Sequence, residues 1–172
     1  TVDPLNSPDL SGHTIRTSSA QAPMVRGLGG EVVNMPASEV YTALERGAVD
    51  GFGWASVGVA ANGWQDVVGY QIEPRFGDAT ITVVINAGTF DGLDDATQQA
   101  LRDTLAEVEP DIVDLYRQRA EEEQQAYLDA GVEVVSFEGD DATRVLETYY
   151  VDGYDAVGYD SIVAQYPAAE EL

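Results

Sequence analysis

Short apolar runs alternate along this chain with segments in which apolar residues recur every three or four positions. The short runs predict strands, at 13–17, 31–35, 49–54, 67–71, 79–86 and 132–137. The run at 79–86, ATITVVIN, is the most strand-like because it is richest in β-branched residues. Helical spacing indicates helices at 22–28, between Ser38 and Gly47, at 95–131 and at 141–150. Strands that alternate with helices predict an α/β fold.

Residues with capping chemistry mark the ends of two of these helices. Ser38 is a good N-cap for the first of them, and Gly47 is a plausible C-terminal stop. Asp95, followed three positions later by Gln98, resembles a capping box at the start of the long helix. Pro110 lies inside that helix, where it lacks a backbone N–H. We therefore expect Pro110 to kink the long helix or to split it in two.

Composition narrows the possible partners. The 172 residues contain 31 Asp and Glu but only 8 basic residues, all arginine, for a net charge of −23. Such a polyanion lacks the cations that bind nucleic acid or anionic lipid, so neither is expected as a partner. Self-repulsion at this charge is relieved by high salt, which suggests a salt-adapted source. No apolar run approaches the roughly 18 residues of a membrane helix.

Enzyme and metal signatures are weak. The chain has no cysteine and one histidine, His13, which lies on a predicted strand without a partner motif. It has no G-x-S-x-G elbow and no lysine for a phosphate-binding loop. The acidic runs lack the calcium-loop pattern and are typical of solvated helix faces. We therefore expect no cofactor and no metal. A hydrolase or isomerase that uses a carboxylate pair stays open as an alternative.

Arg16 is the first candidate for binding chemistry. It lies on a predicted strand and is followed by Thr17, Ser18 and Ser19. A guanidinium group matches a carboxylate bidentately, and hydroxyls beside it would complete an anion site. The alternative is that Arg16 forms a surface ion pair with one of the many acids.

Two aromatic residues form the second candidate. Phe52 and Trp54 flank Gly53 directly after a predicted strand. Ligands of α/β sheets bind outside the carboxyl ends of the strands, so these residues could wall a pocket. At least one of them could instead belong to the core. Trp64, Tyr70 and Phe76 are more typical of core or lobe packing.

The order of these motifs resembles a known family. The segment DLSGHTIRTSS at 9–19 is similar to a D-L-x-G-x-K-x-R element of the solute-binding proteins of tripartite ATP-independent periplasmic (TRAP) transporters. The segment MPASEVYTALERGAVDGFGW at 35–54 resembles their most typical stretch. TFDGLDDATQQAL at 89–101 resembles the start of their long helix. One departure is His13-Thr14, where the family commonly has a lysine.

The resemblance implies a non-enzymatic receptor that captures an organic acid in the periplasm and delivers it to the TRAP membrane subunits. It implies a periplasmic-binding-protein-like lobe, with a type II-like sheet and flanking helices. Arg16 would pair with the ligand carboxylate, and Ser18 or Ser19 would add a hydroxyl contact. Phe52, Gly53 and Trp54 would supply further contacts. Ala37 and Asn86 correspond to regions near the pocket in relatives.

Length is the larger departure, because proteins of this family are nearly twice as long. The resemblance implies a second-lobe core at 1–86, a long connecting helix within 87–131, and a C-terminal segment at 132–172 that packs back. The N-terminal lobe would be missing, and an export signal would have been removed. The helix has an apolar stripe that would then need the missing lobe or a second copy as partner: Leu101, Leu105, Val108, Ile112, Leu115, Tyr116 and Ala120. The rival interpretation is an acidic protein-interaction module without a small ligand.

Overall fold

The computed structural model describes residues 1–77 and 82–156. Its first part is built on a parallel three-stranded sheet formed by β1 (Thr14–Arg16), β2 (Glu31–Val33) and β3 (Gly51–Phe52), in the order β2-β1-β3. Each strand lies inside one of the first three predicted runs. Because the strands are parallel, their carboxyl ends lie at the same edge of the sheet.

Two helices connect these strands. α1 (Ala22–Gly27) follows β1, and α2 (Ala37–Glu45) follows β2. The N-cap of α2 is Pro36, without a side-chain cap, so the prediction of Ser38 as the N-cap is wrong. The chain enters the helix directly after the proline, whose carbonyl already accepts a hydrogen bond from the Glu39 amide at 3.0 Å. Gly47 ends this helix as expected, in a left-handed conformation with φ 65°.

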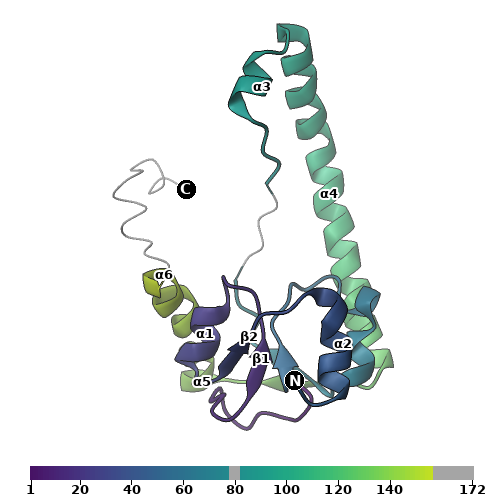
Figure 1. Ribbon diagram of the computed structural model, residues 1–172. Helices are drawn as coiled ribbons and strands as arrows, with labels where there is room; N and C mark the ends of the chain where they lie inside the picture. The colour runs from purple at the N-terminus through teal and green to yellow at the C-terminus, as the bar shows by residue number, and fades with distance from the viewer. Residues whose placement is uncertain (78–81, 157–172) are drawn as a thin grey trace.

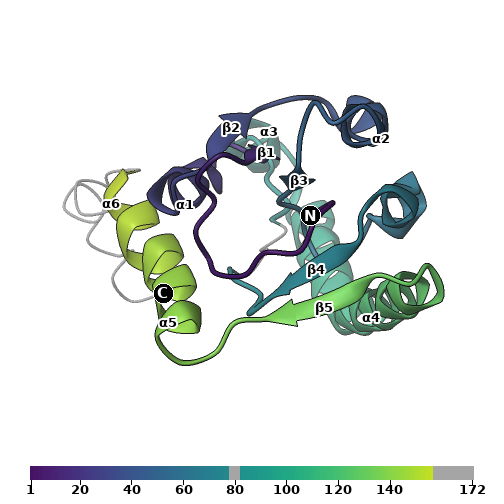
Figure 2. The ribbon, with the colours of Figure 1, turned by 90° about the horizontal axis from the view of Figure 1, so that it is seen from below.

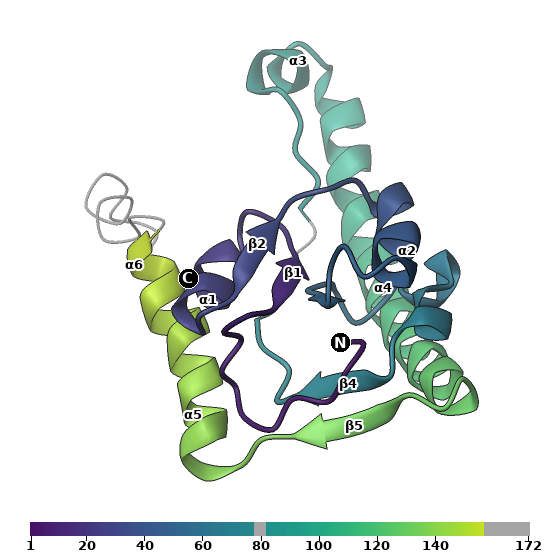
Figure 3. The same cartoon turned by 60° about the horizontal axis from the view of Figure 1, so that its bottom comes forward.

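The second sheet joins distant parts of the sequence. β4 (Tyr70–Glu73) pairs in parallel with β5 (Glu133–Ser136), and Tyr70 lies opposite Glu133. The two strands run side by side in Figures 2 and 3, with α4 rising beside them. Two short 3-10 turns, η1 (Ala60–Asn62) and η2 (Trp64–Val67), lead into β4.

The long helix α4 (Asp95–Asp129) connects these two strands and is continuous over 35 residues. Of the two alternatives for Pro110, the split is wrong, because the helix continues on both sides of the proline, and the kink stays a prediction. Its N-cap is Asp94, whose Oδ1 accepts from the Thr97 amide at 2.9 Å. The capping box predicted from Asp95 and Gln98 is therefore wrong: the cap is one residue earlier, and Gln98 Nε2 donates instead to the Phe90 and Leu93 carbonyls. Figure 1 shows α4 as a long rod that projects beyond the sheets.

The segment before α4 differs from the prediction. Residues 82–86 form no strand, although they belong to the run judged most strand-like. Residues 79–81 of that run lie outside the described residues. A strand needs a hydrogen-bonded neighbour, and no described strand pairs with residues 82–86. The segment instead leads to the short helix α3 (Ala87–Asp91) beside the far end of α4 (Figure 1), and Val84 is 84% exposed.

The C-terminal helices pack against α1. α5 (Gly139–Glu147) leads through a π-helical turn, Thr148–Asp152, into α6 (Gly153–Ala156), which places the predicted helix at 141–150 correctly. Gly27 allows a close approach here, because a Cβ on it would lie 2.5 Å from the Thr148 Cγ2. Residues 157–172 of the predicted C-terminal segment lie outside the described residues.

Two apolar clusters form the core. One joins β1, α1 and α5 through residues such as Ile15, Val25 and Val145. The other packs α2 on η2, with Val40 and Trp64 at its centre. Trp64 is 1% exposed, which confirms its prediction as a core residue. Among the described residues, no helix is both long and apolar enough to cross a membrane.

Candidate functional site

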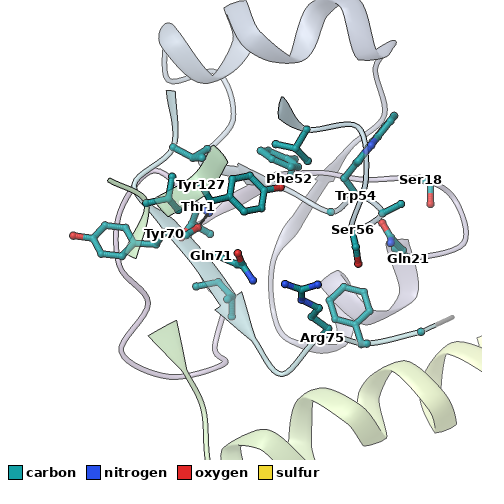
Figure 4. Close-up of a pocket in the computed structure, with 18 of the residues that line it drawn as sticks. Thr1, Ser18, Gln21, Phe52, Trp54, Ser56, Tyr70, Gln71, Arg75 and Tyr127 are labelled. Atoms are coloured by element: carbon teal, nitrogen blue, oxygen red, sulfur yellow. Dashed lines mark hydrogen bonds between the residues drawn. The ribbon is translucent and has the colours of Figure 1, made fainter. Parts of the chain in front are cut away.

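A cavity of about 380 Å³ opens between the two sheets and α4. The ends of β1 and β3 form one wall and β4 forms another (Figure 4). Ala120, Gln124 and Tyr127 of α4 contribute a third. Its lining is Thr1, Ser18, Ala20, Gln21, Phe52, Gly53, Trp54, Ala55, Ser56, Val59, Val68, Tyr70, Gln71, Ile72, Arg75, Phe76, Gly77, Ala120, Gln124, Tyr127, Val132 and Tyr149. Tyr70 and Phe76, expected in the core, are half-buried residues of this lining.

Strand register brings four of the predicted site residues together. Arg16 at the end of β1 lies opposite Phe52 at the end of β3, and the Gly53 amide donates to the Arg16 carbonyl at 2.8 Å. The chain leaves both strands at this edge. Ser18, Phe52, Gly53 and Trp54 consequently line one cavity. Their convergence agrees with the rule that α/β proteins bind ligands at the carboxyl ends of strands.

The two aromatic residues serve both the core and the cavity. The rings of Phe52 and Trp54 each meet Trp64 edge to face, with centroids 4.9 Å apart in both pairs. Since Trp64 is fully buried, it fixes the position of both rings. The sequence offered core packing and pocket wall as alternatives, and these side chains do both.

Arg16 lies behind the cavity wall. Its side chain is 7% exposed, and its guanidinium carbon lies 4.7 Å from the centroid of the Trp54 ring. Nη2 and Nε donate to the Met35 carbonyl at 3.0 and 3.3 Å, whereas Nη1 is buried without a hydrogen-bond partner among the described residues. Burial lowers the pKa of Arg16 from its ordinary value. Arg16 forms no ion pair within the described chain, so the surface ion-pair alternative is wrong.

Three other predicted residues lie outside the cavity lining. Ser19 is exposed in the turn that follows β1. Ala37 begins α2 and packs against the cluster around Trp64. Asn86 is the N-cap of α3, where its Oδ1 accepts from the Thr89 amide at 3.0 Å. These three residues are therefore not among the described residues that line the cavity with Trp54.

The cavity contains polar residues that the sequence reasoning missed. Gln21 lines it and accepts a hydrogen bond from the buried Thr17 hydroxyl at 2.8 Å. Gly53 leaves room for this pair, because a Cβ there would lie 2.7 Å from the Gln21 Oε1. Gln71 also lines the cavity, and its Oε1 is buried without a partner among the described residues. The Thr17-to-Gln21 spacing across a helix start could have indicated the first of these contacts.

Arg75 is the main omission. It follows β4, and its side chain points into the cavity in Figure 4. Nε donates to Glu73 Oε1 at 2.9 Å, and Nη2 donates to Gln124 Oε1 of α4 at 2.7 Å. The second contact spans 49 residues of sequence, so no local pattern could have revealed it.

One carboxylate of α4 binds the loop that follows Trp54. Glu123 is 7% exposed, and its two oxygens accept from the Gly58 and Ala60 amides, both at 2.7 Å. These bonds fix the loop that follows Trp54 against the helix. Tyr127, one turn further along α4, lines the cavity, and burial, reinforced by the charge of Glu123, raises its pKa to about 12.

An aromatic and polar cavity at the carboxyl ends of parallel strands is a site for a small molecule in an α/β protein. Residues 1–149 match the family described as bacterial extracellular solute-binding protein, family 7. The chain belongs to that family, and its mixed α/β fold confirms the predicted fold class. Within the described residues, no group of three or more His, Asp or Glu side chains is arranged to hold a metal ion.

Solved TRAP periplasmic solute-binding proteins share this fold. The protein from Desulfovibrio salexigens with bound orotic acid matches at 23% identity and a TM-score of 0.75, over 89% of this chain and 50% of that chain. The protein from Roseobacter denitrificans with bound β-D-glucuronate matches at 25% identity and 0.70, over 90% and 52%. The protein from Rhodoferax ferrireducens with bound malonate matches at 20% identity and 0.67, over 86% and 48%. The chain thus spans about half the length of these structures.

Proposed function

We propose that this chain is the ligand-binding half of a periplasmic receptor that captures an organic acid and delivers it to the membrane subunits of a TRAP transporter. The observation that carries the proposal is the cavity at the strand ends, with the unpaired Nη1 of Arg16 buried behind Trp54. A buried, unpaired guanidinium N–H is costly, and an anion that accepts from it removes the cost. The role is capture and release, without catalysis.

The ligands of similar proteins support an acid. Orotic acid, β-D-glucuronate and malonate, bound in the three solved structures, all carry a carboxyl group. They differ widely in size and ring structure. A shared anchor for the carboxylate, combined with a variable wall for the rest of the molecule, accounts for that range.

In the proposed complex the ligand carboxylate reaches Arg16 past the edge of Trp54. Nη1 donates one hydrogen bond, and the hydroxyl of Ser18 donates another. A hydrogen bond to a charged group contributes about 1.5–3 kcal/mol. Phe52 and Gly53 define the shape of the adjacent wall. Ser19, Ala37 and Asn86 are not among the described residues that line the cavity, so we assign them no contact in this complex.

Half of the receptor would come from outside the described residues. The apolar stripe on α4 is uncovered: Leu105, Ile112, Leu115 and Tyr116 are between 42% and 49% exposed. We propose that a first lobe, or else a second copy of the chain, covers this stripe. Closure over the cavity would exclude water and strengthen the pairing with Arg16.

The same exposed stripe favours a second candidate, an acidic protein-interaction module that docks through α4. In that case partner binding would depend on Ile112 and its neighbours and would be indifferent to Arg16. The effect of Arg16→Ala on binding therefore distinguishes the two candidates.

The test is a thermal-shift screen of organic acids with the full-length protein, in high salt to screen its negative charge. We expect one carboxylate to raise the melting temperature in a concentration-dependent way. Arg16→Ala should abolish the shift. Arg117→Ala is the matched control, because it removes an arginine of α4 that is 73% exposed and is not among the described residues that line the cavity. A folded protein that no acid stabilises, or an Arg16→Ala variant that responds normally, contradicts the proposal.

A further inference from the structure

The charge pattern of the cavity departs from that of the whole chain. Asp and Glu make up 31 of the 172 residues, yet neither occurs among the described residues that line the cavity. Arg75 is the only described lining residue with a charged side chain. In a protein of net charge −23, an acid-free wall with one guanidinium group creates a local site for an anion.

Arg75 is held in place from two sides. Glu73 accepts from its Nε at 2.9 Å, and Gln124 accepts from its Nη2 at 2.7 Å. Nη1 has no hydrogen-bond partner among the described residues, and the side chain is 49% exposed. In Figure 4 the guanidinium group extends from the end of β4 into the cavity, on the side of Gln71. A fixed, half-exposed guanidinium fork with a free N–H is preorganised for a carboxylate.

Glu73 orients Arg75 and does not occupy the cavity. Its carboxylate lies outside the lining and accepts three hydrogen bonds, from the Arg75 Nε, from the Arg75 amide at 2.8 Å and from Gln71 Nε2 at 2.7 Å. These bonds direct the remaining N–H groups of Arg75 away from Glu73. The ion pair reduces the local positive charge, but Nη1 of Arg75 keeps no hydrogen-bond partner among the described residues.

We infer that Arg75 is a second carboxylate contact and that the ligand carries two anionic groups. The inference rests on the proposed function, in which Arg16 binds the first carboxylate. Arg16 reaches the cavity from the end of β1 behind Trp54, whereas Arg75 reaches it from the end of β4. An acid with a single carboxylate, bound at Arg16, would leave the Nη1 of Arg75 without an acceptor when the site closes, although Glu73 and Gln124 still hold the other nitrogens. The free-energy cost of that unsatisfied N–H disfavours acids with one carboxylate, so the site selects a dianion.

The experiment compares dicarboxylates of three to six carbons with the monoamide of each acid, by titration calorimetry on the full-length protein. The monoamide keeps the size of the acid and loses one charge. We expect the wild type to bind its best dicarboxylate roughly tenfold to a hundredfold more tightly than the monoamide. Arg75→Met should bring this ratio close to one, while binding of the monoamide changes little.

Matched variants separate structure from recognition. Arg117→Met removes one exposed arginine elsewhere and should leave the ratio unchanged. Arg75→Lys keeps the charge but loses the fork, so we expect a ratio between those of the wild type and Arg75→Met; it also serves if Arg75→Met does not fold. Arg16→Ala should weaken both the acid and its monoamide.

The two possible failures are distinct. A wild type that binds monocarboxylates as tightly as dicarboxylates, or a ratio that survives in Arg75→Met, overturns the inference while leaving the receptor proposal intact. Equal loss of acid and monoamide in Arg75→Met also overturns it, because Arg75 would then not read the second group. Failure of every acid to bind the wild type would instead remove the proposed function itself.

Discussion

The sheet region and the projecting part of α4 use the same kinds of apolar residue with opposite results. Trp64 is 1% exposed between α2 and the strand ends, whereas Leu115 on α4 is 49% exposed. Both belong to apolar patterns that sequence reasoning identifies correctly. The difference teaches that a hydrophobic stripe specifies which face of an element is to be covered, but does not specify by what.

The largest expected effect sharpens this contrast. Trp64→Ala removes the ring that Phe52 and Trp54 both contact, so we expect it to lower the free energy of unfolding by about 3–5 kcal/mol. Leu115→Ala on the exposed stripe should change it by less than about 0.5 kcal/mol. Urea denaturation measures the free energy of unfolding. Tryptophan fluorescence can monitor it in the leucine variant, and circular dichroism can monitor it in both variants. Equal losses would show that the stripe is already covered in solution.

The next largest effect on stability is expected at the junction between the two regions, where Glu123 of α4 accepts hydrogen bonds from the Gly58 and Ala60 amides. Glu123→Gln replaces one of two carboxylate oxygens by an amide nitrogen, which faces the donor N–H of Gly58 or Ala60. The unsatisfied donors should cost about 1–3 kcal/mol of stability in urea denaturation. Glu122→Gln is the control, since Glu122 is 48% exposed and bonds only to its own helix. A Glu122 variant as destabilised as the Glu123 variant would refute the role of the junction.

The pH dependence of stability tests the same junction. Burial, with the nearby charge of Glu123, raises the pKa of Tyr127 in the folded protein to about 12, above the ordinary value of 10.0. The folded state therefore holds its proton more tightly than the unfolded state. Its contribution to stability is complete below pH 10 and is lost as the pH rises from about 10 to 12. In melting curves over that range, Tyr127→Phe should fall less steeply than the wild type; an unchanged slope would contradict the burial of this hydroxyl.

The smallest effect concerns the stripe itself. Ile112→Ser together with Leu115→Ser should leave the stability of the sheet region within about 0.5 kcal/mol. This double variant should associate more weakly with the partner that covers α4, whether that partner is a first lobe or a second copy of the chain. Sedimentation of the chain, alone and as part of the full-length protein, measures this. Self-association that persists in the double variant would place the contact on another surface.

Sequence reasoning located most strands and helices because local spacing encodes them. It failed at 82–86, the described part of the run ATITVVIN, which has strand-forming residues but no described strand beside it. It offered a kink or a split at Pro110, and the split is wrong because α4 is continuous over 35 residues. At 82–86 the missing strand neighbour is a property of the fold that the local sequence does not record.

The candidate site was found in the same uneven way. Phe52, Gly53 and Trp54 follow a strand, and strand ends are predictable. Arg75 was missed because its role depends on Gln124, which approaches from α4 only in the folded chain. Arg16 was selected as a carboxylate contact, which stays a prediction. The sequence did not indicate its burial behind Trp54, because that position depends on the packing of Trp64.

A crystal structure of the full-length protein with its preferred acid tests the central claim most directly. We expect a carboxylate oxygen within about 2.7–2.9 Å of the Arg16 Nη1, with the ligand lying in the cavity against Trp54 and Phe52. A ligand bound elsewhere, or one whose carboxylates all lie beyond hydrogen-bond distance of Arg16, would contradict the claim.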